Sequence, residues 1–202
     1  MSGSWRLFVA VPLQALAGPA LAAIRTRWDG GPRGVRWVEP EQLHLTLRFL
    51  GETPRERVEP LVGELGRIAR PEGAAPIRLV GGGAFPDPRR ARVLWLGVAA
   101  DWLEPLAGAV EAGVRRLGWP AERRRFLPHL TVGRSRRESP VDVSDLIGSW
   151  QGHPWASGSV AEFALYRSEL RPEGARYSVV ARFPFSPLPL STSGHGRILG
   201  EK

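Results

Sequence analysis

A four-residue pattern occurs twice in the chain and constrains its fold more than any other feature. His44-Leu45-Thr46-Leu47 in the first half returns as His129-Leu130-Thr131-Val132 in the second, and an arginine, Arg48 or Arg134, follows each histidine within five residues. With so few threonines in the sequence, two such coincidences would arise by chance in roughly 0.4% of cases. The alternation predicts two β-strands, each with its histidine and threonine on one face and its apolar residues in the core. A duplicated, two-lobed architecture would bring the two polar faces opposite each other.

The periodicity of the rest of the chain predicts helices and strands in mixed order. Strands are expected over 5–11, 34–39, 43–51, 76–84, 91–99, 129–134, 160–170 and 176–185. Helices are expected over 12–28, 54–70, 101–117 and 142–151, with Asp101 as the N-cap of the third. Turn residues at 85–90 join two strands as a hairpin. This order indicates an α+β fold, or an α/β sandwich, with mostly antiparallel sheets.

Length and composition are sufficient for one domain, or two small lobes, with a sizeable core: 202 residues, 43% apolar and 24% charged. We expect a single domain over residues 1–185 and a disordered Pro-, Ser- and Gly-rich tail over residues 186–202. The longest apolar stretch, 7–24, is interrupted by two prolines and a glutamine, so no transmembrane helix is expected. A strand followed by a helix explains that stretch better than a signal peptide does. The absence of cysteine excludes disulfides and thiolate metal sites and fits a reducing compartment.

Almost the whole net charge of +8 comes from one segment. Residues 115–137 contain eight arginines and a single acid, Glu122. A solvated basic face and a surface for a polyanion such as RNA explain this run about equally well.

The two histidine motifs together supply the groups needed for displacement at phosphorus. Two imidazoles on opposite sides of a ligand can act as general base and general acid near neutral pH. Threonine hydroxyls can donate hydrogen bonds to the non-bridging phosphate oxygens. Such a reaction needs no metal and no other cofactor. A zinc site is less favoured, because neither motif has a carboxylate or cysteine at ligand spacing, and two structural histidines bonded to the backbone are the remaining alternative.

With their flanks, the motifs resemble those of the 2H phosphoesterase superfamily, in particular the RNA 2′,3′-cyclic phosphodiesterases, also called 2′-5′ RNA ligases. The resemblance covers about residues 5–185 and is strongest at 5–12, 43–51, 91–97, 126–134, 165–170 and 174–177. It implies a bilobal α+β fold, with two pseudo-symmetric lobes of mostly antiparallel sheet, outer helices and a central cleft. It also implies metal-free hydrolysis of a terminal 2′,3′-cyclic phosphate to a 2′-phosphomonoester, with 2′-5′ ligation as the reverse reaction.

The resemblance further implies roles for seven residues. His44 would donate a proton to the departing 3′ oxygen, and His129 would accept one from water. The substrate-binding residues would be Thr46, Thr131, Arg134, Phe8 and Phe49. The threonines would hold the non-bridging oxygens, the arginine would face the phosphate, and the phenylalanines would line the nucleotide side. The motif pattern is nearly symmetric, so it does not orient the substrate, and it is equally compatible with reversed roles for the histidines.

The expected partner is RNA with a 2′,3′-cyclic phosphate end, such as a tRNA fragment, acted on by a cytoplasmic monomer with no membrane contact and no obligate protein partner. Two alternatives stay open. One is a 2H phosphoesterase for a small cyclic nucleotide or an ADP-ribose cyclic phosphate, and the other is a non-catalytic RNA-binding module that uses the arginine run. His153, in the loop-like stretch 152–155, and His195 are expected to be bystanders. Packing roles are expected for Trp37, Trp95 and Trp155.

Overall fold

The computed structural model describes residues 3–28, 34–68, 70–136, 140–171 and 174–185. The strands are β1 (Ser4–Pro12), β2 (Val35–Trp37), β3 (His44–Pro54), β4 (Ala75–Phe85), β5 (Val93–Ala99), β6 (His129–Ser135), β7 (Pro154–Val160), β8 (Glu162–Arg171) and β9 (Gly174–Pro184). The α-helices are α1 (Gln14–Arg27), α2 (Val58–Gly66), α3 (Leu103–Arg116) and α4 (Ser144–Trp150). Short 3₁₀ turns cover Pro40–Gln42, Arg55–Arg57 and Pro88–Arg90.

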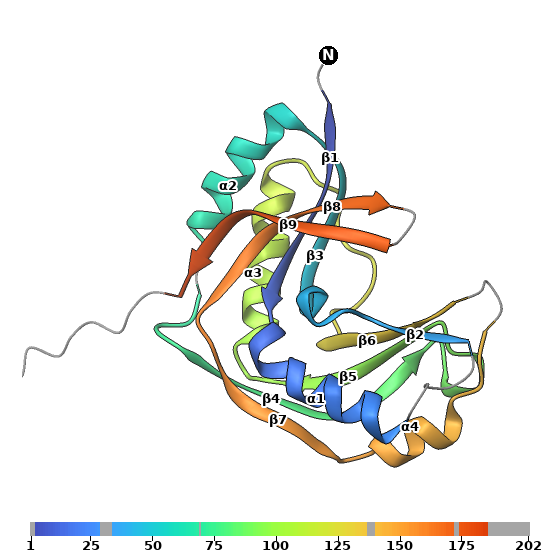
Figure 1. Ribbon diagram of the computed structural model, residues 1–202. Helices are drawn as coiled ribbons and strands as arrows, with labels where there is room; N and C mark the ends of the chain where they lie inside the picture. The colour runs from blue at the N-terminus through green and yellow to red at the C-terminus, as the bar shows by residue number, and fades with distance from the viewer. Residues whose placement is uncertain (1–2, 29–33, 69, 137–139, 172–173, 186–202) are drawn as a thin grey trace, which may run out of the picture.

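The strands form two antiparallel sheets, one in each lobe (Figure 1). The first sheet has the order β3-β1-β8-β9 and the second the order β2-β6-β5-β4-β7. Every described strand pair is antiparallel. The predicted α+β class with two lobes of antiparallel sheet and outer helices is therefore confirmed.

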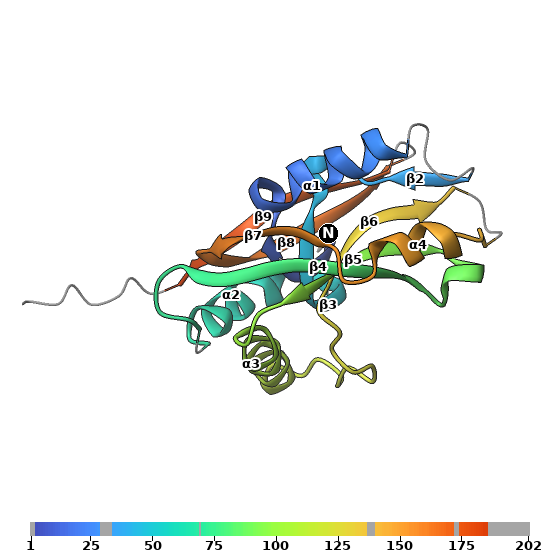
Figure 2. The ribbon, with the colours of Figure 1, turned by 90° about the horizontal axis from the view of Figure 1, so that it is seen from below.

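Each of the two long helices packs against the sheet of the opposite lobe. α1 follows β1 of the first sheet but packs on β7 of the second, whereas α3 follows β5 of the second sheet and contacts β3 of the first. The view from below shows α1 on one side of the sheets and α2 and α3 on the other (Figure 2). Gly158 permits the close approach of α1, because a Cβ there would lie 2.9 Å from a methyl group of Leu16. The crossed packing joins the lobes into one structure through a continuous apolar core.

Most predicted elements are confirmed, including the hairpin of β4 and β5. Two helix starts differ from prediction. The segment predicted as a helix from residue 54 begins with the 3₁₀ turn Arg55–Arg57, and α2 ends at Gly66. Asp101 is not the N-cap of α3: that position is Trp102, and no side chain caps it by a hydrogen bond. An exposed aspartate before an apolar run is therefore an insufficient signal when the chain enters the helix through a turn.

The structure adds the sheet assignment of two predicted strands and one strand that was not predicted. The expected strands at 34–39 and 43–51 both exist but lie in different sheets, so the chain crosses from lobe to lobe between Trp37 and His44. β7 was not predicted, and the loop assigned to 152–155 is wrong from Pro154 onward. β7 is an edge strand that starts at a proline and is rich in small residues, so it lacks the apolar alternation on which the prediction depended.

The predicted tail at 186–202 lies outside the described residues, so the domain bounds stay a prediction. In the described part of the chain, no helix has the length and hydropathy needed to cross a membrane.

Candidate active site

The two motif strands meet although they belong to different sheets. β3 and β6 contact each other, and a cleft of about 590 Å³ lies along them. All seven residues predicted for the site line this cleft: His44, His129, Thr46, Thr131, Arg134, Phe8 and Phe49. The two copies of the repeated pattern, 85 positions apart in the chain, therefore face one shared space.

The alternation predicted for the motifs is observed in both strands. Leu45 and Leu130 are fully buried, whereas the histidine and threonine on either side of each are only partly buried. Because side chains two positions apart share a face of a strand, each strand presents one imidazole and one hydroxyl to the cleft.

Backbone carbonyl groups fix both imidazoles in the same way. Nδ1 of His44 lies 2.6 Å from the carbonyl oxygen of Gln42, and Nδ1 of His129 lies 2.7 Å from that of Leu127. A carbonyl oxygen can only accept, so Nδ1 carries the proton in both rings and Nε2 is left to exchange a proton with a ligand. Sequence reasoning missed Gln42 and Leu127, although their shared position two residues before each histidine is a signal in retrospect.

Burial keeps both histidines neutral at neutral pH. Desolvation lowers the pKa of His44 to about 4, and the positive charge of Arg134, together with the charge that His129 carries when it is protonated, adds to that effect. Desolvation also lowers the pKa of His129, with a further contribution from Arg134. At neutral pH each Nε2 is therefore an unprotonated acceptor, and a bound anion is needed to raise the protonated fraction of either ring.

A β-bulge in each motif strand determines which residue after the threonine faces the cleft. The register of β3 against β1 skips Leu47, and that of β6 against β5 skips Val132. After the bulge, the residue five positions beyond each histidine faces the cleft: Phe49 in β3 and Arg134 in β6. In the two copies of the repeated pattern, the position equivalent to Arg134 is therefore Phe49. Arg48, the arginine that follows the first histidine in the sequence, is not equivalent to Arg134.

Arg48 points away from the cleft and has a structural role. It is only 8% exposed. Its Nε lies 2.7 Å from Oε2 of Glu111 in α3, and its Nη1 lies 3.3 Å from Oε2 of Glu122. It thereby ties β3 to α3 and to the loop that follows this helix.

Aromatic rings surround His44 on its own lobe. Phe8 lies 4.9 Å from the imidazole between ring centroids and stacks on Tyr166 at 5.2 Å. Tyr177 meets the imidazole edge-on at 5.2 Å. Phe8 is 2% exposed and Phe49 56% exposed. Phe8 therefore orients the histidine ring from beneath, and Phe49 is the phenylalanine that offers a free face to a base.

His129 has a smaller aromatic shell on the other lobe. Phe85 contacts its ring edge-on at 5.2 Å, and Trp95 lies 6.2 Å away. The packing role predicted for Trp95 agrees with this position against β4 and the imidazole. Of the bystander histidines, His153 packs on Trp155 outside the cleft, and His195 lies outside the described residues.

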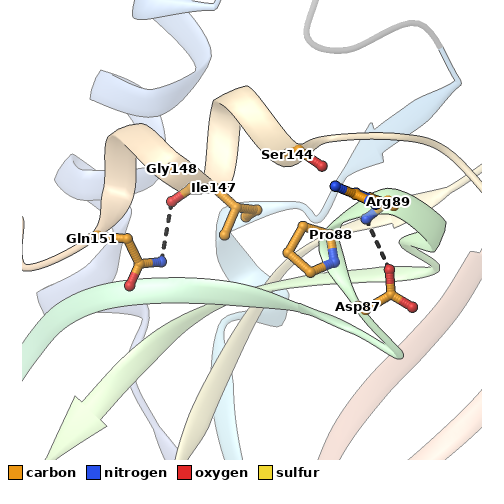
Figure 3. A pocket seen from close by; sticks show the side chains of 7 residues that line it. All are labelled: Asp87, Pro88, Arg89, Ser144, Ile147, Gly148 and Gln151. Carbon is orange, nitrogen blue, oxygen red and sulfur yellow. Dashed lines mark hydrogen bonds between the residues drawn. The ribbon is translucent and has the colours of Figure 1, made fainter.

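A second hollow, of about 430 Å³, shares no residue with the cleft (Figure 3). It lies between α4 and the turn at Pro88–Arg90, where Asp87 accepts a hydrogen bond from the backbone N–H of Arg89. No histidine lines it, so it lacks the acid and base groups of the cleft. Within the described ranges, no group of three or more His, Asp or Glu side chains is placed to hold a metal ion.

A family model described as LigT-like phosphoesterase matches residues 11–95 and 96–177, and each stretch contains one histidine motif. An RNA 2′,3′-cyclic phosphodiesterase of Archaeoglobus fulgidus is 35% identical over 173 residues, which cover 85% of this chain and 96% of that protein. One of Thermus thermophilus is 36% identical over 188 residues, covering 88% and 89%.

Solved structures agree with these relationships. The Thermus thermophilus protein TT0787 matches 90% of this chain and 98% of its own with a TM-score of 0.73 and 33% identity. Escherichia coli LigT complexed with 3′-AMP matches 90% and 98% with a TM-score of 0.69 and 28% identity.

Proposed function

Because the chain belongs to the LigT-like phosphoesterase family, we propose that it is an enzyme that hydrolyses the 2′,3′-cyclic phosphate at the end of an RNA to a 2′-phosphomonoester. The observation that carries the proposal is the pair of histidines in one cleft, each held with Nδ1 bonded to the backbone and Nε2 free for proton transfer. The named relatives favour this substrate over the small cyclic phosphates and over the non-catalytic RNA-binding module.

In the proposed reaction, Nε2 of His129 takes a proton from water as the water oxygen bonds to phosphorus. The bond from phosphorus to the 3′ oxygen breaks, and Nε2 of His44 gives its proton to that oxygen. The products are a 2′-phosphate and a 3′-hydroxyl. The proton then returns from His129 to His44 through solvent, so the protein is unchanged.

This allocation of roles comes from the family resemblance. The two rings are held alike, and burial lowers the pKa of the proposed acid, His44, to about 4. The bound anionic phosphate must therefore raise the pKa of His44 so that the ring can be protonated, because an adjacent negative charge raises a histidine pKa. By microscopic reversibility, the same groups catalyse 2′-5′ ligation when a 5′-hydroxyl end takes the place of water.

The other cleft residues contact different parts of the substrate from the two lobes. Thr46 and Thr131 lie beside the histidines, where their hydroxyls can donate to the non-bridging oxygens. Arg134 supplies a positive charge from the second lobe, and Phe49 supplies an exposed ring from the first. Phe49 therefore marks the side of the cleft that receives the base, and Arg134 adds a charged contact to the phosphate between the two motifs.

Hydrolysis of an RNA ending in a 2′,3′-cyclic phosphate tests the proposed function directly. The purified protein is incubated with this substrate in EDTA, and the 2′- and 3′-phosphate products are resolved by chromatography. The expected product is the 2′-phosphate, at an undiminished rate in EDTA, because no proposed step uses a metal. A 3′-phosphate product, or a rate abolished by EDTA and restored by a divalent cation, would contradict the mechanism.

The pH dependence of kcat/KM is expected to be bell-shaped, with its alkaline limb below the ordinary histidine pKa of about 6.5. One ring must be protonated and the other neutral in the free enzyme, and both pKa values are lowered. Activity should therefore fall as the pH rises through 7. The alkaline limb of kcat should lie at higher pH, since bound phosphate favours the imidazolium form. Both limbs belong to the pair rather than to one ring. A kcat/KM that rises between pH 6 and 7.5 would contradict these shifts.

We also propose that the substrate is an RNA end such as a tRNA fragment and that the reaction takes place in the cytoplasm. The cleft lies within one chain, so the proposed active form is a monomer.

A further inference from the structure

The arginine run at 115–137 is separated by the fold into several places. Of its eight members, two lie in the last turn of α3, one lines the cleft from β6, one donates to the backbone of β2, and one lies outside the described residues. The other three are consecutive and exposed: Arg123, Arg124 and Arg125. We call this segment the arginine loop.

The arginine loop is held in place through Glu122. Its Oε1 accepts the backbone N–H groups of Arg123 at 2.9 Å and Arg124 at 3.1 Å, and its Oε2 faces the buried guanidinium of Arg48. The backbone N–H of Glu122 donates to Glu111 at 3.0 Å, and Arg48 also donates to the carbonyl oxygen of Pro120. The backbone is thereby fixed from the protein side.

Among the described residues, the side chains of the arginine loop form no ion pair shorter than 4.0 Å, although the charge of Arg124 contributes to lowering the pKa of Glu122. The contact of Arg125 with Glu104 is 4.0 Å long and joins two exposed groups, so it contributes little. Within the described residues, neither Arg123 nor Arg124 forms a side-chain ion pair.

The arginine loop is continuous with the cleft. Arg124 is itself one of the cleft-lining residues, and the chain runs from the loop through Leu127 directly to His129. Leu127 is 49% exposed, which leaves an apolar surface between the cations and the catalytic ring. The charged side chains that line the cleft are Arg6, Arg36, Arg124, Arg134 and Glu39. Their excess of positive charge continues outward along the loop.

We propose that the arginine loop binds the phosphodiester backbone of the RNA upstream of its cyclic end. This inference rests on the proposed function: a cyclic phosphate occupies the 3′ terminus, so the rest of the RNA must leave the cleft on its 5′ side. Exposed arginines beside an apolar side chain are suited to single-stranded RNA, because they contact phosphates without reading sequence. The arginine loop thus makes a longer RNA a better substrate than a dinucleotide with the same end.

The test compares an Arg123→Gln/Arg125→Gln variant with the unmodified protein on a dinucleotide and on an RNA of about 12 nucleotides, both ending in a 2′,3′-cyclic phosphate. Arg124 is kept because it lines the cleft. For the long RNA, two lost phosphate contacts should make the slope of log kcat/KM against log salt shallower by about 1.4. Between about 50 and 200 mM salt, the unmodified protein should thus lose about sevenfold more activity than the variant. For the dinucleotide the two proteins should agree.

The matched control is Arg78→Gln/Arg90→Gln, which removes two exposed arginines that do not line the cleft. It changes the net charge equally, so it should behave as the unmodified protein on both substrates. The proposal is overturned if the loop variant keeps the wild-type slope on the long RNA, or if the control loses as much. If the unmodified protein hydrolyses neither substrate, the proposed function is wrong. Fluorescence anisotropy of the labelled long RNA then tests the loop alone, and equal salt slopes for variant and wild type would refute it.

Discussion

Replacing either cleft histidine with alanine is expected to lower kcat on an RNA 2′,3′-cyclic phosphate by about 10²- to 10⁴-fold. His44 and His129 are held in one cleft with the same nitrogen free, so each variant removes one of the two proton transfers. The double variant should lose little more than the worse single variant, because the two groups act as a unit. The measurement is single-turnover hydrolysis by the three variants.

A substrate with sulfur in place of the 3′ bridging oxygen separates the roles of the two histidines. A thiolate leaves without a proton at neutral pH far more readily than an alkoxide, since thiols ionise near pH 8.5. On this substrate His44→Ala should regain most of its lost rate, whereas His129→Ala should stay impaired. The opposite pattern would reverse the roles, and equal impairment of both variants would contradict the division into acid and base.

His153→Ala is the matched control for these variants. It removes an imidazole that packs on Trp155 at 4.2 Å and does not line the cleft. Its activity should equal that of the unmodified protein. If this variant were as impaired as the other two, loss of an imidazole at any site would explain the effect, and the assignment of the cleft would fall.

Arg134→Gln is expected to lower kcat by about 10²- to 10³-fold, the cost of removing one donor to the charge that develops on the phosphoryl oxygens. The variant has a second readout that a loss of folding would not produce. The Arg134 cation lowers the pKa of both His44 and His129, so its removal should move the bell of kcat/KM to higher pH. Arg134→Lys keeps a positive charge and should leave the bell near its original position.

A single Arg78→Gln change serves as the control for this pair, because that exposed arginine lies on β4 outside the cleft lining. If Arg134→Gln lowers kcat but leaves the bell in place, the guanidinium does not act on the imidazoles electrostatically. If kcat stays within about threefold of the unmodified protein, Arg134 does not bind the reacting phosphate.

The sequence predicts the site well where it depends on the two-residue period of a strand. Leu45 and Leu130 in the core force the residues beside them onto the opposite face, and this places His44 and His129 correctly. The side-chain directions beyond the bulges could not be predicted. A bulge depends on how β3 pairs with β1 and how β6 pairs with β5, and the local sequence gives no sign of it.

Other parts of the fold could not be predicted for similar reasons. The burial of Arg48 depends on carboxylates from α3 and from the loop after it, which are more than 60 positions away in the chain. The positive charge of the arginine run was evident from the sequence. How its arginines are distributed among α3, the arginine loop and β6 depends on where α3 ends and where β6 begins. β7 is an edge strand whose pairing with β4 makes up for its weak local preference.

The matching bulges also have a consequence for the roles of the two histidines. A cleft whose two lobes were identical would accept a cyclic phosphate in two orientations of equal energy, related by the twofold axis, and either histidine could then act as the acid. In this chain the positions that follow the bulges hold a cation on one side and an aromatic ring on the other, Arg134 and Phe49. A charge-assisted hydrogen bond worth about 2 kcal/mol favours one orientation by roughly 30-fold. The division of the acid and base roles between the histidines is thus decided by how one pair of equivalent residues differs across an approximate twofold axis.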